Sequence, residues 1–220
     1  DNEKLTFTGD GGGVRVHYYG DATLIGNIIR NNRAGRHGGG LTASRDVTLI
    51  SNVIAGNTCG LDSTNGQGAG MWLGQGELYN NTFANNSGGD GSGVRVGGDA
   101  TLKNTIFYGN GVGVNAYADS VVTMDGTLWY ANGQNTTGDG TINPGSVNVY
   151  EDPLFVDAGG GDFRLEAGSP TIDAGVAVPM AREDAAGNAR PDCVVWDIGA
   201  YEAQAGATSC LRGFLPTVFK

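Results

Sequence analysis

The sequence predicts an all-β fold, a right-handed parallel β-helix with three short strands per coil and an irregular C-terminal cap and tail. Two observations predict it. An asparagine recurs at intervals of 22 to 29 residues, each time at the end of a similar phrase, and apolar residues keep fixed distances from it. The asparagines are Asn32, Asn57, Asn86, Asn110 and Asn132. A repeat of this length is typical of one coil of a solenoid.

Two apolar columns share the register of the asparagines. One column stands three positions before them, at Ile29, Ile54, Phe83, Phe107 and Trp129, and the other stands eight positions before them, at Leu24, Leu49, Leu78, Leu102 and Met124. In a β-helix every strand pairs with the same strand of the next coil, about 4.8 Å away, so like residues stack on like. Stacked amides donate to one neighbour and accept from the other. We therefore interpret the asparagine column as structural.

The elements follow in order along the chain. Residues 1–175 are expected to form the β-helix, with regular coils over 11–132 and an irregular last coil over 133–175. The first strand of each regular coil is predicted at 14–16, 41–43, 71–73, 94–96 and 114–116. In the last coil we expect a loop at 133–140, then strands at 147–150, 153–156 and 163–165. Residues 176–202 are predicted to form a cap, and 203–220 a linker and hydrophobic tail.

Composition limits the classes of partner. The chain has 220 residues, 40 of them glycine, and a formal net charge of −10, which argues against nucleic acid and anionic membranes. No stretch approaches the ~18 apolar residues of a membrane span. The glycines are expected at turns that need positive φ. The first residues are strand-like and carry no signal peptide, so we expect that a secretion signal was removed.

Three cysteines leave the pairing open. We expect a disulfide between Cys193 and Cys210, although Cys59 is an alternative partner for either. A disulfide is typical of an extracellular or cell-surface location. No cysteine or histidine spacing indicates zinc, and His17 and His37 are isolated.

The C-terminal third carries a specific resemblance. It contains, in order, the segments 152–157, 162–165, 168–175, 184–191 and 197–202. Over 11–202 the chain resembles bacterial secreted right-handed parallel β-helix repeat proteins of the pectate-lyase-like superfamily, with a C-terminal region of the choice-of-anchor type. The resemblance implies an exported protein and leaves its activity open. Residues 215–219 match a sortase signal only in their first two residues, so we expect a packing segment there.

The outward-facing residues of the first strands do not indicate an enzyme active site. The outward column of the first strands contains Arg15, Thr42, Trp72, Arg95 and Asn115, with no carboxylate. A calcium-dependent lyase needs converging carboxylates, and a glycoside hydrolase needs a carboxylate pair. Arg15, Trp72 and Arg95 are instead a candidate polysaccharide face, on which Trp72 either stacks on a sugar or is simply an exposed aromatic. Enzymatic activity stays open, with a non-catalytic role favoured.

Other polar residues have structural interpretations. Asp21, Asp46 and Asp99 form a column in a turn, where we expect each to bond its own backbone. The alternative is calcium, and we otherwise predict no cofactor. Asn135, in a predicted loop, is the candidate glycosylation site. We expect Asp184, Asp197 and Glu202 to make hydrogen bonds within the cap.

The sequence favours a non-catalytic extracellular protein with a structural, adhesive or matrix role. We expect self-association, even into filaments, through an open coil end and an apolar tail. The tail residues are Phe214, Leu215, Val218 and Phe219. A contact that repeats without closing gives a fibre. The alternative is a β-helix enzyme or binding protein that acts on a surface polysaccharide.

Overall fold

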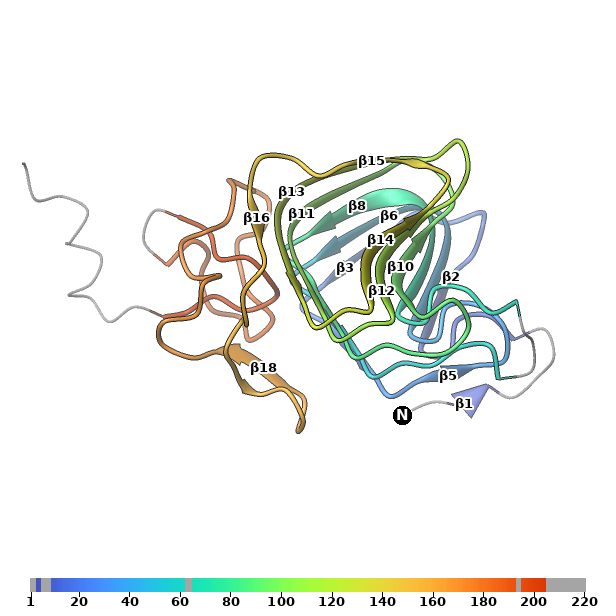
Figure 1. The fold of residues 1–220 in the computed structure, drawn as a ribbon, viewed down its shortest axis with the longest axis horizontal. Coiled ribbons are helices and arrows are strands. Elements are labelled where there is room, and N and C mark those ends of the chain that lie inside the picture. Colours follow the sequence, from blue (N-terminus) through green and yellow to red (C-terminus); the bar gives the residue numbers. More distant parts are fainter. Residues whose placement is uncertain (1–2, 5–8, 62–64, 193–194, 205–220) are drawn as a thin grey trace, which may run out of the picture.

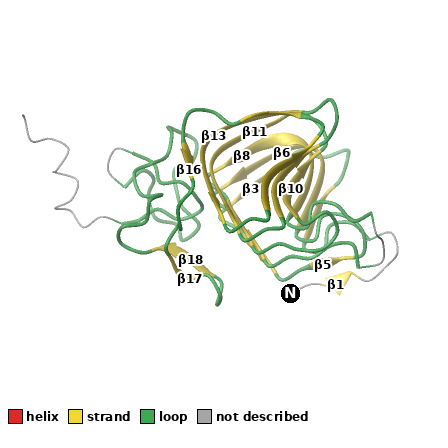
Figure 2. Cartoon of the chain, viewed as in Figure 1, coloured by secondary structure: helices red, strands yellow, loops and turns green. Residues whose placement is uncertain are grey.

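A computed structural model describes residues 3–4, 9–61, 65–192 and 195–204. The described part consists of strands and loops without a helix (Figure 2). It accordingly contains no helix long and apolar enough to cross a membrane. Most strands wind into a parallel β-helix, and the described residues after 149, namely 150–192 and 195–204, lie along its side (Figure 1).

Three faces make up each coil. The first face contains β2 (Val14–Val16), the start of β6 (Leu41–Ile50) and of β8 (Met71–Tyr79), β10 (Ser92–Val96), β12 (Val112–Ala116) and β14 (Gln134–Gly138). The second contains β3 (Ala22–Ile25), the ends of β6 and β8, the starts of β11 (Ala100–Tyr108) and β13 (Val121–Tyr130), and β15 (Thr141–Asn143). The third contains β4 (Ile28–Arg30), β7 (Val53–Ala55), β9 (Thr82–Ala84), the ends of β11 and β13, and β16 (Asn148–Val149).

Four short strands lie outside these faces. They are β1 (Glu3–Lys4), β5 (Arg33–Ala34), β17 (Phe155–Asp157) and β18 (Asp162–Leu165). β1 pairs with β5 in parallel, and β17 and β18 form an antiparallel hairpin.

Strand register confirms the predicted columns. The leucine column pairs from Leu24 through to Met124, and the second apolar column pairs from Ile29 through to Trp129. The rings of Phe83, Phe107 and Trp129 stack, with centroids 5.5 and 5.0 Å apart. Repetition of one coil thus produces a continuous apolar core, because each side chain rests on its own kind.

The asparagine ladder is confirmed as well. Each Nδ2 donates to the Oδ1 of the next asparagine, over 3.0, 3.1, 3.0 and 3.2 Å from Asn32 to Asn132. The inner members also donate to a backbone carbonyl, as Asn57 does to Ile29 at 2.9 Å. Buried amides are therefore satisfied, as the burial of polar groups requires.

A second, shorter ladder was not predicted. Asn27 donates to Asn52 at 3.0 Å, and Asn52 donates to Asn81 at 3.1 Å. These asparagines occupy the second position of the repeated phrase, where later coils have Thr105 and Thr127. The sequence signal was present but interrupted, because only three coils carry the amide.

A left-handed residue makes each sharp corner before the main ladder. Asn31, Gly56 and Asn85 have φ values of 55°, 64° and 54° in successive coils. Asparagine and glycine adopt this conformation most readily. A Cβ at Gly56 would lie 2.6 Å from the Oδ1 of Asn31, so the asparagine of one coil requires a glycine in the next.

The loop prediction for residues 133–140 was wrong. Gln134–Gly138 forms β14, which pairs in parallel with β12 from Val112↔Gln134 to Ala116↔Gly138. Backbone pairing with the preceding coil overrides the polar, glycine-rich composition, which is weak in intrinsic strand preference. Asn135 therefore lies in a strand, where its Oδ1 accepts a bond from Asn132 at 3.4 Å.

The C-terminal region packs against the corner between the second and third faces (Figure 1). Val178 and Ala181 contact Ile50 and Tyr79, and Ile198 packs on the third face. Asn104, in a left-handed conformation at the corner, exchanges two bonds of 2.7 Å with the backbone of Val176. The corner turns thus supply polar partners for the backbone of an irregular segment.

Candidate functional site

One outward column of the first face collects the residues expected to contact a ligand. Strand register aligns them over five coils. We call this column the Trp72 face: Arg15, Thr42, Trp72, Arg95 and Asn115. Because neighbouring strands lie about 4.8 Å apart, the column extends about 19 Å along the solenoid axis.

The Trp72 face is more enclosed than an open sheet surface. Thr42, Arg95 and Asn115 are buried, Trp72 is half-buried, and the side chain of Arg15 is exposed. Loops between coils account for this, since the Thr42 hydroxyl donates to the carbonyl of His37 at 3.3 Å. The His37 ring stacks on Trp72 with centroids 6.5 Å apart. Sequence columns could not predict this cover, because it comes from the variable loops.

Arg95 is held in place with one donor unused. One of its terminal nitrogens donates to the Oδ1 of Asn115, and its guanidinium lies 4.8 Å from the ring centre of Tyr117. Asn115 donates in turn to Asp90 at 3.1 Å. The Nε of Arg95 is buried and has no hydrogen-bond partner within the described residues. An unsatisfied buried donor is costly, and a ligand acceptor would reach this one only after the Arg95 side chain moves outward.

Asp10 organises the loop that carries His37. Its carboxylate accepts bonds from Nε and Nη2 of Arg36 at 2.9 and 2.7 Å, and from the backbone N–H of His37 at 3.2 Å. Burial opposes ionisation of Asp10, but these bonds outweigh it and hold its pKa below the usual value. Burial, followed by the charge of Arg36, lowers the pKa of His37, which favours its neutral form.

The carboxylate beside the Trp72 face is engaged in hydrogen bonds with its neighbours. Asp90 is the carboxylate beside Arg95, and both its oxygens are engaged, Oδ1 by Ser92 and Gly68 and Oδ2 by Asn115. In the described part of the chain, no three His, Cys, Asp or Glu side chains could hold a metal ion together. What the face offers is an aromatic surface, a neutral imidazole and guanidinium donors.

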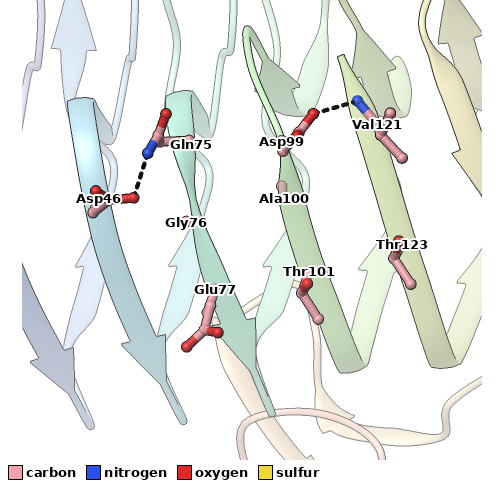
Figure 3. Close-up of a pocket in the computed structure, with 9 residues that line it drawn as sticks. All are labelled: Asp46, Gln75, Gly76, Glu77, Asp99, Ala100, Thr101, Val121 and Thr123. Atoms are coloured by element: carbon pink, nitrogen blue, oxygen red, sulfur yellow. Dashed lines mark hydrogen bonds between the residues drawn. The ribbon is translucent and has the colours of Figure 1, made fainter.

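A shallow acidic groove runs along the second face (Figure 3). It has a volume of about 410 Å³, and its lining includes Asp46, Glu77, Asp99, Thr101 and Thr123. The side chain of Gln75 donates to Asp46 at 2.6 Å, and the backbone N–H of Val121 donates to Asp99 at 3.0 Å.

These contacts correct one expectation. Asp46 and Asp99 bond to the following coil instead of to their own turns, because the equivalent turn lies only one strand spacing away. Calcium at this column remains an expectation drawn from the sequence.

Of the residues named in the cysteine and tail predictions, the structure describes Cys59 alone. Cys193, Cys210 and the tail residues Phe214, Leu215, Val218 and Phe219 lie outside the described residues. Cys59 is a free, buried thiol, and burial raises its pKa to about 12. A thiol in this environment is protonated and unreactive near neutral pH.

The cap residues make the hydrogen bonds expected of them. The carboxylate of Asp184 accepts from the backbone N–H groups of Ala186 and Asn188, both at 2.8 Å. The carboxylate of Asp197 accepts from the backbone N–H of Asp173 at 2.8 Å. Glu202 accepts backbone bonds and forms a buried ion pair with Arg190 at 3.1 Å. Arg190 was not singled out from the sequence, where nothing distinguishes it from a surface arginine.

Comparison with protein families agrees with this architecture. The model of the right-handed β-helix region matches residues 2–129, more than half of the chain. The chain therefore belongs to this family. The comparisons with curated proteins and with solved structures gave no match. The function must accordingly be inferred from the geometry of the faces.

Proposed function

We propose that this chain is a non-catalytic, extracellular adhesive β-helix protein that binds a polysaccharide along the Trp72 face. The observation that carries the proposal is Trp72 itself. Its half-buried indole stands in one column with Arg95, which keeps a buried Nε–H without a partner in the described structure. The extracellular location rests on the resemblance of residues 152–202 and is checked by fractionation of the producing cells.

An extended polymer suits a surface that repeats. Polar side chains recur once per coil over about 19 Å, so successive units of a linear ligand meet successive coils. An aromatic ring offers a rigid apolar surface to the C–H face of a sugar. The guanidinium of Arg95 offers donors to hydroxyl or carboxylate oxygens.

The non-catalytic part of the proposal rests on the carboxylates. Cleavage of a glycosidic bond by the usual route requires two acidic side chains on either side of it. Asp10 and Asp90, the acids near the Trp72 face, are both committed to loop and side-chain contacts. Each therefore supports the architecture of the face.

One observation favours self-association as a second function. Within the described residues, β14 pairs only with β12, so its other edge presents free backbone groups. An unpaired edge accepts an added strand. The apolar segment 211–219 is our candidate for that strand, supplied by a neighbouring copy.

Affinity electrophoresis tests the polysaccharide proposal. Wild-type protein should be retarded by at least one member of a panel of neutral and acidic polysaccharides. Trp72→Ala should weaken that retardation about tenfold, as loss of ~1.4 kcal/mol implies. Tyr150→Ala, which removes an exposed aromatic elsewhere, is the matched control. Equal retardation of both variants would contradict the proposal, and release of sugar products would contradict its non-catalytic part.

A further inference from the structure

A second cavity lies on the opposite part of the molecule, between the third face and the β17–β18 hairpin. It has a volume of about 200 Å³. The solenoid contributes Arg30, Asn31 and Asn85, and the hairpin loop contributes Gly159–Gly161. Figure 1 shows this hairpin reaching out from the C-terminal region below the solenoid. The cavity shares no residue with the Trp72 face.

Three exposed polar side chains of this crevice make no polar contact with the rest of the described protein. Within the described part of the chain, the guanidinium of Arg30 has no hydrogen bond or ion pair, and the side-chain amides of Asn31 and Asn85 have no hydrogen bond. This contrasts with the ladder asparagines, whose amides are all engaged. Convergent polar groups without partners are typical of a ligand pocket.

The repeat itself explains the opening. Asn31, Gly56 and Asn85 occupy the same corner in three successive coils, each with a left-handed backbone. Since Gly56 has no side chain, the amide of Asn31 lies over it, with its Oδ1 2.6 Å from where a Cβ would stand. Asn31 and Asn85 themselves are about 10 Å apart, at two strand spacings. Arg30 pairs with Ala55 in the next coil, whose methyl group leaves room for the guanidinium.

The hairpin closes the crevice from the other side. Gly161 has φ of 85°, and a Cβ there would lie 3.2 Å from the Nη1 of Arg30, so glycine permits the close approach of the loop. The acids of the hairpin lie outside the lining: Asp157 accepts from the N–H of Gly160 at 2.9 Å, and Asp162 pairs with Arg164 at 2.5 Å. Among the residues that line the crevice, Arg30 carries the one charge.

We propose that this crevice binds a sugar acid, either free or as the terminal unit of a chain. A guanidinium recognises a carboxylate through two parallel hydrogen bonds. The amides of Asn31 and Asn85 both donate and accept, as recognition of hydroxyl groups requires. The volume lies below the roughly 300 Å³ at which pockets for larger ligands begin, and it suits one ring. Ala55 and Phe163 supply an apolar floor.

Titration calorimetry with glucuronate, a triuronate, glucose and acetate tests the proposal. Glucuronate should bind, while glucose lacks the carboxylate and acetate lacks the hydroxyls, so both should bind at least tenfold more weakly. Arg30→Gln should weaken glucuronate binding about ten- to hundredfold. Asn85→Gly keeps the left-handed backbone that Gly56 and Gly109 adopt at the same corner and should weaken binding severalfold.

Arg45→Gln is the matched control, because it removes the same charge from a position in β6 that does not line the crevice. Binding that is equal in Arg30→Gln and Arg45→Gln, or the absence of binding by both uronates, would overturn the assignment. Equal affinity for glucuronate and the triuronate would show that a single sugar acid is sufficient for binding. Tighter binding of the triuronate would show that the crevice recognises the end of a chain. Trp72→Ala should leave this binding unchanged, which separates it from the polysaccharide face.

Discussion

A single ladder asparagine illustrates how the fold is stabilised at the residue scale. The Nδ2 of Asn86 donates to the carbonyl of Ile54 at 2.9 Å and to Asn110 at 3.0 Å. Its Oδ1 accepts from the backbone N–H and the side chain of Asn57 at 3.0 and 3.1 Å. Both donors and both acceptors of the amide are satisfied, so no other side chain can replace it.

Asn86→Ala should therefore destabilise the protein strongly. The substitution leaves the backbone N–H of Asn57 and the carbonyl of Ile54 buried without these partners, at a cost of about 3 kcal/mol. Urea unfolding measures the change. Asn135→Ala, at the half-exposed end of the ladder, should cost below about 1 kcal/mol. Similar values for the two variants would argue against the ladder as a stabilising element.

At the element scale, the loops between coils decide what the first face presents. Asp10 anchors the loop that places His37 against Trp72, through bonds to Arg36 and to the backbone of His37. The coil supplies the tryptophan, but the loop determines how much of it is covered. Loop and strand thus define the Trp72 face together.

The anchoring by Asp10 predicts a dependence on acid. Because the pKa of Asp10 is lower in the folded protein, its contribution is complete above about pH 4 and is lost as pH falls through the folded value. At pH 7, Asp10→Asn should lower the free energy of unfolding by roughly 1.5 kcal/mol. In urea unfolding, the difference between the two proteins should shrink as pH falls below about 4. A difference that stays constant as the pH falls would show that ionisation of Asp10 is irrelevant.

At the scale of the whole molecule, a repetitive solenoid is joined to an irregular segment along its side. Side chains of the corner turns contact this segment: Ser51 donates to the carbonyl of Glu183 at 2.7 Å, and Asn80 donates to that of Asp197 at 3.0 Å. Asn104 adds two bonds to Val176. The C-terminal segment therefore depends on the side chains of left-handed corner residues in three successive coils.

Asn104→Gly should loosen this attachment without unwinding the coils. Glycine keeps the φ of 52° but removes both bonds to Val176. Hydrogen exchange of the Val176 amide should accelerate about tenfold or more, while amides of β11 stay protected. Asn31→Gly, at a corner without such bonds, should leave Val176 unchanged. Unaltered exchange in Asn104→Gly would indicate that apolar contacts alone hold the segment.

How far the sequence predicted the site differs between the Trp72 face and the crevice at Arg30. The alignment of Arg15, Trp72 and Arg95 followed from the coil period, since register repeats with it. The enclosure by His37 did not follow, because that loop has no counterpart of the same length in other coils. The crevice at Arg30 could not be predicted, since half of it comes from a hairpin more than 120 residues away.

The sequence by itself determined the coil, its three faces, the apolar columns and the asparagine ladder. Each recurs in every coil, and a repeated pattern allows only one register in which like residues stack. Tertiary structure alone decided that residues 134–138 join the sheet, that the C-terminal segment lies along a corner, and that Arg30 faces a hairpin. These contacts occur once, between segments distant in sequence. They depend on shape and on backbone hydrogen bonds, which a sequence repeat does not predict.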